Sequence, residues 1–171
     1  MIKFRTVLAA AAATLLLAAG PALVRAAETK PAETGPIYIN PLIVISNLEK
    51  SVDYYTRLIG LKEANRVPLG NGGYEVILTT TGSDWDTGVG LIYQPSRKDA
   101  LTHGTAYNRM AFFVRSADEV DARVKKIADE GYKIVVPPST SKAGKRTYRY
   151  AHFKDPDGYT VEFTWFDPKA E

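Results

Sequence analysis

A single acidic residue stands in the middle of an apolar and aromatic run near the C-terminus. Residues 154–166 read KDPDGYTVEFTWF, and Glu162 is the only charged side chain after the turn formed by 155–158. Proline and glycine favour that turn, and the β-branched and aromatic residues that follow it predict a strand. A carboxylate in a buried strand is costly unless it is paired, protonated or bound to a metal ion. The chemistry of this chain therefore depends on what Glu162 faces.

The rest of the sequence narrows the chemistry that Glu162 could join. The chain has no cysteine, which excludes disulfides and a lipoprotein anchor. It contains no nucleophile elbow and no zinc-ligand spacing, and its glycine-rich segment at 70–73 lies between two predicted strands rather than before a phosphate-binding helix. Of the two histidines, His103 lies in a predicted loop and His152 in a predicted strand. His152 is therefore the candidate general acid or base, although a lone histidine on a strand is more often structural.

The N-terminal residues have the pattern of a secretory signal peptide. Lys3 and Arg5 precede an apolar run at 7–19, and small residues surround a predicted cleavage site after Ala26. Residues 1–26 are thus predicted to be a cleaved signal peptide, which places the mature protein in the periplasm of a bacterium or outside the cell. The apolar run is short for a membrane span of about 20 residues. An uncleaved anchor is the weaker alternative, and we expect no stable membrane insertion after cleavage.

The chain that follows the leader is electrically neutral. The sequence has 22 basic and 19 acidic residues, and Lys3, Arg5 and Arg25 belong to the predicted leader, which leaves 19 basic residues. Binding to nucleic acid therefore has no global electrostatic support. Residues 27–36, AETKPAETGP, contain no large apolar side chain and are predicted to form a disordered tether.

From residue 37 onward the hydrophobic pattern runs through the same course twice. Each half is predicted to contain one strand, one helix and three further strands. The first half places them at 37–45, 47–60, 62–67, 74–79 and 87–93. The second half places them at 107–114, 116–131, 132–136, 147–153 and 159–166. A repeated βαβββ unit indicates an α+β fold made of two tandem modules with a pseudo-symmetric pair of sheets.

Three segments carry a family resemblance: VISNLEKSVDYYTRLIGL at 44–61, MAFFVRSADEVDARVKKI at 110–127 and DPDGYTVEF at 155–163. In this order and spacing they resemble the vicinal oxygen chelate superfamily, the fold of glyoxalase I, bleomycin-resistance proteins and extradiol dioxygenases. The resemblance covers 37–167 as one domain, with module one at 37–94 and module two at 104–166. It implies that each module curls and that two modules close a pocket, whose floor often holds a divalent metal ion.

The resemblance also implies where metal ligands would stand. In that family they are His or Gln on the first strand of each module and Glu on the last. Spacing, together with the overlay of one module on the other, puts these positions at Asn40, Gly90, Arg109 and Glu162. Three of the four depart from the pattern, because glycine offers no ligand and arginine brings a positive charge to the place of the cation. We therefore expect no metal cofactor, and we predict an ion pair between Glu162 and Arg109.

Strand alternation, combined with the resemblance, predicts the rest of the pocket. Side chains of a strand alternate between its two faces, so an inward Arg109 directs Phe113 inward as well. On the preceding strand the same argument turns Tyr148, Tyr150 and His152 toward the cavity. We take these residues, with Asn40, as ligand-binding candidates, and His152 and Glu162 as candidate catalytic residues. The alternative is that the two tyrosines pack between the modules.

Loops are predicted to cover this pocket. Trp85 lies in the loop GSDWDTG and is a further ligand-binding candidate. Residues 137–146, PPSTSKAGKR, are predicted to be a flexible basic loop that acts as a lid or is simply solvated.

Two functions from different classes fit these residues. The first is an exported, metal-free protein that binds a small aromatic or oxygenated molecule, as the resemblance to bleomycin-resistance proteins implies. The second is an enzyme on the same fold. It would be a metal-independent lyase or isomerase that uses His152 and Glu162, or a diverged enzyme similar to lactoylglutathione lyase. The sequence leaves the choice open, and a homodimer is an additional hypothesis.

Overall fold

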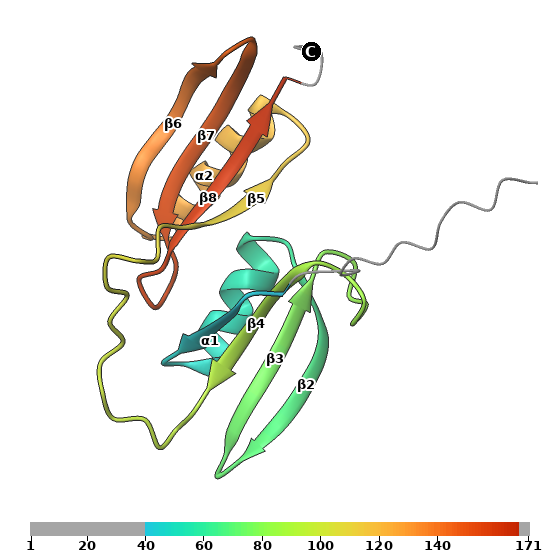
Figure 1. Ribbon diagram of the computed structural model, residues 1–171, viewed down its shortest axis with the longest axis vertical. Helices are drawn as coiled ribbons and strands as arrows, with labels where there is room; N and C mark the ends of the chain where they lie inside the picture. The colour runs from blue at the N-terminus through green and yellow to red at the C-terminus, as the bar shows by residue number, and fades with distance from the viewer. Residues whose placement is uncertain (1–39, 168–171) are drawn as a thin grey trace, which may run out of the picture. The chain divides into compact units, whose positions relative to one another are not determined.

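The computed structural model of the protein describes residues 40–167 (Figure 1). The predicted signal peptide at 1–26 and the predicted tether at 27–36 lie outside these residues and stay predictions. Within 40–167, no helix is long and apolar enough to cross a membrane.

Module one contains the predicted succession of strand, helix and three strands. Its elements are β1 (Leu42–Ile45), α1 (Leu48–Asp53), the π-helix η1 (Tyr54–Leu58), β2 (Lys62–Gly70), β3 (Gly73–Thr79) and β4 (Gly88–Tyr93). The sheet has the order β1-β4-β3-β2, in which β1 runs parallel to β4 and the other neighbours are antiparallel. A parallel first strand needs a crossover, and the helical segment provides it.

Module two repeats this arrangement. Its elements are β5 (Met110–Phe113), α2 (Ala117–Asp129), β6 (Ile134–Ala143), β7 (Arg146–Lys154) and β8 (Thr160–Phe166). The sheet order is β5-β8-β7-β6, and β5 runs parallel to β8. The two sheets thus have the same topology, which confirms the predicted α+β fold of two tandem βαβββ modules.

The helix predicted at 47–60 differs from the structure in its second half. Asn47 caps α1 by accepting a hydrogen bond from the Lys50 backbone N–H at 3.0 Å, but from Tyr54 onward the helix widens into η1. The wider turn directs two consecutive aromatic side chains, Tyr54 and Tyr55, into the core, where both are fully buried. A regular α-helix turns by about 100° per residue and would separate these two side chains.

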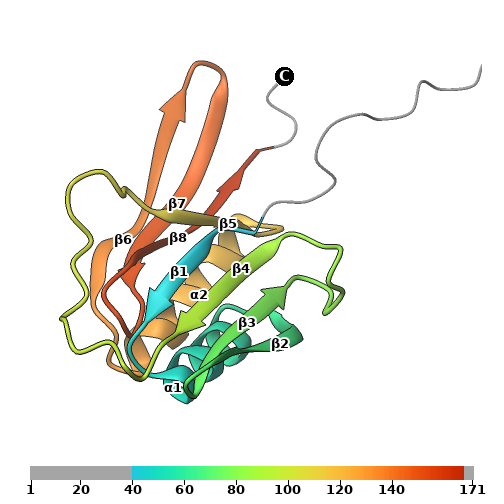
Figure 2. The same cartoon turned by 60° about the horizontal axis from the view of Figure 1, so that its bottom comes forward.

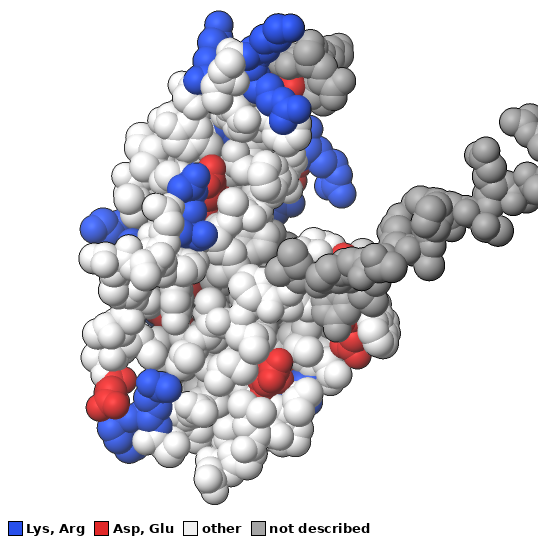
Figure 3. Space-filling view, in the orientation of Figure 1, with Lys and Arg blue, Asp and Glu red and all other residues white. Residues whose placement is uncertain are grey.

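The predicted loop at 137–146 is wrong, because most of these residues belong to the two strands of a hairpin. β6 continues to Ala143 and pairs with β7 as far as Arg146. Gly144, with φ +61°, supplies the positive dihedral that the tight turn requires. The adjacent prolines at 137 and 138 suggested a loop, but they fall where the register shifts between Val136 and Ser139. Figure 3 shows Lys and Arg side chains gathered over the end of this hairpin, at the top of the view.

Each sheet buries one face beneath its helix (Figure 2). α1 packs against β4, and α2 packs against β6, β7 and β8. The buried residues alternate along the strands, as expected for a sheet with one covered face. In module one they include Ile43, Ile45, Val76, Leu78, Val89 and Leu91, and in module two Ala151, Phe153, Val161, Phe163 and the helix residues Val120, Val124 and Ile127. The remaining face of each sheet carries the side chains of alternate parity.

A turn of module two holds module one through side-chain hydrogen bonds. Asp155 is buried and accepts a hydrogen bond from the Tyr55 hydroxyl at 2.8 Å. Asp157 accepts hydrogen bonds from the Ser46 backbone N–H and the Ser51 hydroxyl, both at 2.9 Å. Burial raises the pKa of the Asp155 carboxyl above its ordinary value, although the hydrogen bonds that it accepts from the Tyr55 hydroxyl and from the Tyr159 and Asp157 backbone N–H groups oppose the shift. The predicted turn at 155–158 therefore also connects the two modules.

Candidate functional site

A pocket of about 330 Å³ lies on the face of the module two sheet that α2 does not cover. Strand register places its residues side by side, because Glu162 on β8 pairs with Ala111 on β5 and with His152 on β7. Tyr150 pairs with Thr164 one step further along the same face. The pocket is lined by Arg109, Ser141, Tyr148, Tyr150, His152, Glu162 and Thr164.

Glu162 faces Arg109, as the sequence predicted. The Arg109 Nε–H donates to Glu162 Oε2, and the two side chains form an ion pair. The Glu162 side chain is only 7% exposed, whereas that of Arg109 is 41% exposed. The carboxylate therefore sits inside the protein with its counter-charge at the edge of the pocket, so the burial of Glu162 is compensated.

His152 is the second polar group beside Glu162. Its Nε2 lies 3.6 Å from Glu162 Oε2, which is beyond hydrogen-bond distance. This nitrogen is buried and has no hydrogen-bond partner among the described residues. Burial lowers the pKa of the imidazole below its ordinary value; the Glu162 carboxylate opposes that shift and Arg109 adds to it. His152 is therefore neutral at pH 7, and a neutral imidazole can accept or donate one proton.

The two tyrosines lie where alternation predicted them. Tyr148 and Tyr150 line the pocket, and the centre of the Tyr150 ring lies 5.5 Å from the centre of the His152 ring. Their rings give the pocket apolar walls, and their hydroxyls add polar groups.

Sequence reasoning missed Ser141 and Thr164. Thr164 was identifiable, since it lies two residues after Glu162 on the same face of β8. Ser141 was not, because the sequence predicted a loop where β6 continues.

Three of the predicted ligand-binding residues are not part of this pocket. Phe113 points to the same face of the sheet but is 67% exposed, with its ring 6.1 Å from that of Phe166. Trp85 is 71% exposed in the loop between β3 and β4, which a hydrogen bond from Thr80 to Asp86 closes on itself. Asn40 precedes β1 in module one, and its Oδ1 is buried without a hydrogen-bond partner among the described residues. The structure thus gathers the other candidates in this pocket and leaves these three outside.

The register confirms the overlay of the two modules. Gly90 pairs with Leu42 just as Glu162 pairs with Ala111, and Asn40 and Arg109 each stand two residues before those partners. A methyl group built on Gly90 would lie 2.1 Å from Leu42 Cδ2. Leucine therefore occupies in module one the space that the glutamate side chain occupies in module two.

These residues do not fit a divalent metal ion. Such ions need several oxygen or imidazole ligands, usually with net negative charge. Here the one carboxylate at the four positions already pairs with Arg109, and Leu42 covers Gly90. In residues 40–167 no three His, Cys, Asp or Glu side chains are grouped so that they could hold a metal ion. The arrangement instead offers a guanidinium, a carboxylate and a neutral imidazole to a bound molecule.

Comparison with known proteins identifies the family. Residues 38–163 match the Glyoxalase/Bleomycin resistance protein/Dioxygenase superfamily. A lactoylglutathione lyase of Neisseria meningitidis serogroup A is 30% identical over 125 residues, which cover 73% of this chain and 87% of that protein. The lactoylglutathione lyase of Escherichia coli O157:H7 is 26% identical over 124 residues, covering 72% and 88%.

Solved structures have the same fold. Glyoxalase I from Zea mays superposes with a TM-score of 0.63 at 22% identity over 75% of this chain, and the match spans only 43% of the maize protein. The fosfomycin resistance protein FosX from Listeria monocytogenes has a TM-score of 0.54 at 18% identity, over 77% of this chain and 94% of that one. The chain therefore belongs to the glyoxalase, bleomycin resistance protein and dioxygenase superfamily.

Proposed function

We propose that the chain binds a small aromatic or oxygenated molecule in the pocket of module two, without a metal ion. The observation that carries this proposal is the Arg109–Glu162 ion pair, which stands where the superfamily resemblance implies metal ligands. Small-molecule sites combine apolar walls with a few convergent polar groups. Tyr148 and Tyr150 supply such walls, and Glu162, Arg109 and His152 supply the polar groups.

The pocket chemistry favours a ligand with a hydroxyl or carbonyl oxygen. A ligand hydroxyl can donate to Glu162 or to His152 Nε2, which otherwise has no partner, and a ligand oxygen can accept from Arg109. An aromatic body would lie against the tyrosine rings. A bound ligand would thus give His152 Nε2 a hydrogen-bond partner. Without one, the burial of this nitrogen costs free energy.

Native mass spectrometry of the purified mature protein tests this proposal. We expect a copurifying small molecule that Tyr150→Ala removes and Val135→Ala keeps, because Val135 is an exposed apolar residue of the same sheet outside the pocket. A ligand retained equally by both variants would contradict this pocket as its site.

Elemental analysis tests the proposal that the protein binds no metal ion. After exposure to Zn²⁺, Ni²⁺ and Mn²⁺ followed by dialysis, we expect no stoichiometric metal in the protein. About one ion per chain, lost in Glu162→Ala, would contradict the proposal.

Export forms the remaining part of the proposal, and it rests on the signal-peptide pattern of residues 1–26. Expressed in a bacterium, the full chain should give a mature protein that begins at or near Ala27 and is released with the periplasmic fraction. N-terminal sequencing that starts at Met1, with the protein in the membrane pellet, would support the uncleaved anchor instead.

A second candidate is a metal-independent lyase or isomerase, and the state of His152 favours it. A neutral imidazole with a free nitrogen beside a carboxylate can take up a proton from a bound substrate. The similarity to lactoylglutathione lyases makes lactoylglutathione the first compound to test. The assay contains a chelator and follows the compound by mass spectrometry. Conversion that His152→Gln and Glu162→Gln abolish would establish the enzyme, and conversion that both variants retain would contradict the roles of these two residues.

A further inference from the structure

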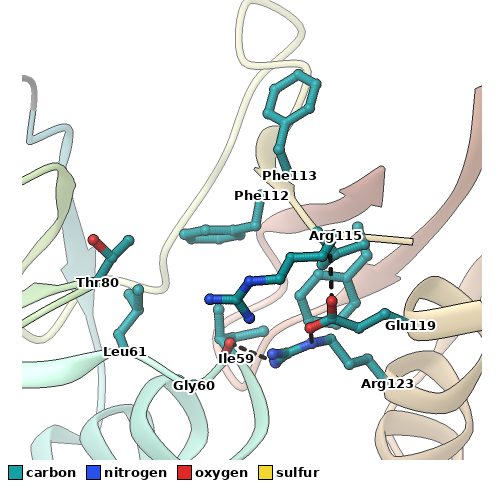
Figure 4. Close-up of a pocket in the computed structure, with 11 residues that line it drawn as sticks. Ile59, Gly60, Leu61, Thr80, Phe112, Phe113, Arg115, Glu119 and Arg123 are labelled. Carbon is teal, nitrogen blue, oxygen red and sulfur yellow. Dashed lines mark hydrogen bonds and ion pairs between the residues drawn. The ribbon is translucent and has the colours of Figure 1, made fainter. Parts of the chain in front are cut away.

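A second cavity of about 260 Å³ lies where the two modules meet, and we call it the cleft (Figure 4). One side is formed by the end of the η1 segment and the start of β2, including Ile59 and Leu61. The other side is formed by the end of β5 and the start of α2, including Phe112 and Arg115. The cleft shares no lining residue with the pocket of module two. None of the residues singled out by the sequence as site candidates, except Phe113, lies at its edge.

Arg115 directs its guanidinium into the cleft (Figure 4). Among the described residues this guanidinium makes no hydrogen bond and no close ion pair, and the Glu119 carboxylate acts on it only through space. Glu119 accepts a hydrogen bond from the Arg115 backbone N–H at 2.9 Å through Oε2 and one from Arg123 Nε at 2.7 Å through Oε1. These two hydrogen bonds, together with the charges of Arg123 and Arg115, lower the pKa of Glu119, so it stays ionised. Among the described residues, Arg115 is therefore the cation of the cleft whose guanidinium donors remain open to a ligand.

Arg123 is a second cation at the base of the cleft, and its position is fixed. Its Nη1 donates to the Ile59 carbonyl at 3.0 Å, and its guanidinium carbon lies 5.5 Å from the centre of the Phe163 ring. The Arg123 guanidinium can lie here because residue 60 is a glycine. A Cβ on residue 60 would lie 3.1 Å from Arg123 Nη1. Arg115 and Arg123 together outweigh the charge of Glu119, so the cleft carries a net positive charge.

The walls beside these charges are apolar. The Phe112 ring lies above the Arg115 guanidinium in Figure 4, and Leu61 and Ile59 face it from module one. An inorganic anion would use the cation alone and leave this apolar surface in contact with water. A flat organic acid would use both, because a guanidinium matches a carboxylate with two parallel hydrogen bonds while the ring packs on apolar side chains.

We propose that the cleft is a binding site for a small organic carboxylate with a flat apolar body, held by Arg115 against Phe112 and Leu61. The site is separate from the pocket of module two and does not depend on the function proposed for it. The ligand would contact both modules at once, so its binding would stabilise their association by mass action. Sites between structural units are a common location for small-molecule binding.

Benzoate is the probe for this proposal. It is titrated into the mature protein, and binding is followed by NMR through the Nε–H signals of the arginines. We expect a saturable shift of the Arg115 signal. Arg115→Gln should weaken binding about tenfold or more, as expected for loss of a charge-assisted hydrogen bond. Arg97→Gln is the matched control, because it removes the same charge from an exposed site outside the cleft, and it should bind benzoate like the wild type.

Each alternative result overturns the proposal. Equal weakening in Arg115→Gln and Arg97→Gln would show attraction to net charge only. Binding that survives in Arg115→Gln but is lost in Tyr150→Ala would place benzoate in the pocket of module two. Sulfate that competes as well as benzoate would contradict a role for the apolar walls. A thermal melt of each variant, compared with the wild type, verifies that the variants remain folded.

Discussion

Modules one and two place different side chains at equivalent points of two equivalent sheets. In module one, Gly90 pairs with Leu42 on one side and Ile77 on the other. In module two, Glu162 pairs with Ala111 and His152 at the corresponding points. The three paired residues of module one are thus apolar, whereas those of module two include an acid and an imidazole.

Side-chain volume explains how the same backbone accommodates both sets of side chains. Leu42 is large and covers the glycine, with its Cδ2 only 2.1 Å from the place that a Cβ of Gly90 would take. Ala111 is small and leaves space beside Glu162, into which Arg109 reaches. The large Leu42 opposite Gly90 fills the surface of the module one sheet. The small Ala111 opposite Glu162 leaves space on the surface of the module two sheet. The βαβββ backbone thus fixes positions, while the pair of residues at each position decides whether a site forms.

The largest expected difference between the modules lies in their last strands. A Cβ on Gly88 of β4 would lie 1.8 Å from the Leu78 carbonyl oxygen, which is backbone and cannot move aside. Gly88→Ala should therefore destabilise the fold by about 3 kcal/mol or more. The equivalent residue of β8 is Thr160, whose hydroxyl only accepts a hydrogen bond from Lys154 Nζ at 2.8 Å. Thr160→Ala should cost about 1 kcal/mol or less. Chemical denaturation measures both, and similar losses would contradict this distinction.

The next largest effect concerns the ion pair that only module two has. Arg109→Ala leaves the carboxylate of Glu162 buried without its counter-charge. Because Arg109 is 41% exposed, we expect a cost of about 2 kcal/mol, between the values for exposed and buried pairs. Adding Glu162→Gln should recover part of that loss, since the buried charge is then removed. Arg97→Ala, at an exposed site, is the control. Coupling between the two substitutions below about 0.5 kcal/mol would show that the pair contributes nothing to stability.

The fold and the ion pair were predictable for a shared reason. Alternation along strands and the repeated βαβββ order are local signals, and so is Ser116, whose hydroxyl caps α2 by accepting a hydrogen bond from the Glu119 backbone N–H. The family resemblance implies which points of the strands to compare, and once the two modules are overlaid, counting residues locates Arg109 and Glu162 at them. The extended hairpin was not predictable, because the two prolines at 137 and 138 suggested a loop and concealed Ser141.

Other features depend on contacts between distant segments. The widened turn η1 follows from burying Tyr54 and Tyr55 together, and the cover of Gly90 follows from the direction of the Leu42 side chain. The hydrogen bonds of Asp155 and Asp157 to module one also join residues about a hundred positions apart. Such contacts leave no periodic pattern in the sequence, so only the structure reveals them.

A smaller effect is expected when the acid is introduced into module one. Gly90→Glu requires the end of the exposed Leu42 side chain to move, and it adds an acid beside Glu75, whose Oε1 lies 3.9 Å from the new Cβ. We expect a loss of about 1 kcal/mol, and Leu42→Ala in the same chain should reduce it by making space. Denaturation of the single and double variants checks this. A loss of unfolding free energy as large as that of Gly88→Ala would mean that module one cannot accommodate an acidic side chain at this position.

The smallest expected effect is a dependence of stability on pH that arises from His152. The residue at the equivalent position of module one is Ile77, which does not titrate. Burial lowers the pKa of His152 in the folded protein below its ordinary value, so the unfolded chain binds the proton more readily. The stability linked to His152 is therefore fully present above about pH 6.5, the unfolded value, and is lost as the pH falls toward the folded one. Between pH 7.5 and pH 5, His152→Gln should flatten the decline in unfolding free energy relative to the wild type. Glu162 raises the pKa of His152, so Glu162→Gln should steepen that decline. Equal slopes in the wild type and His152→Gln, measured by denaturation at each pH, would mean that the imidazole titrates alike in both states.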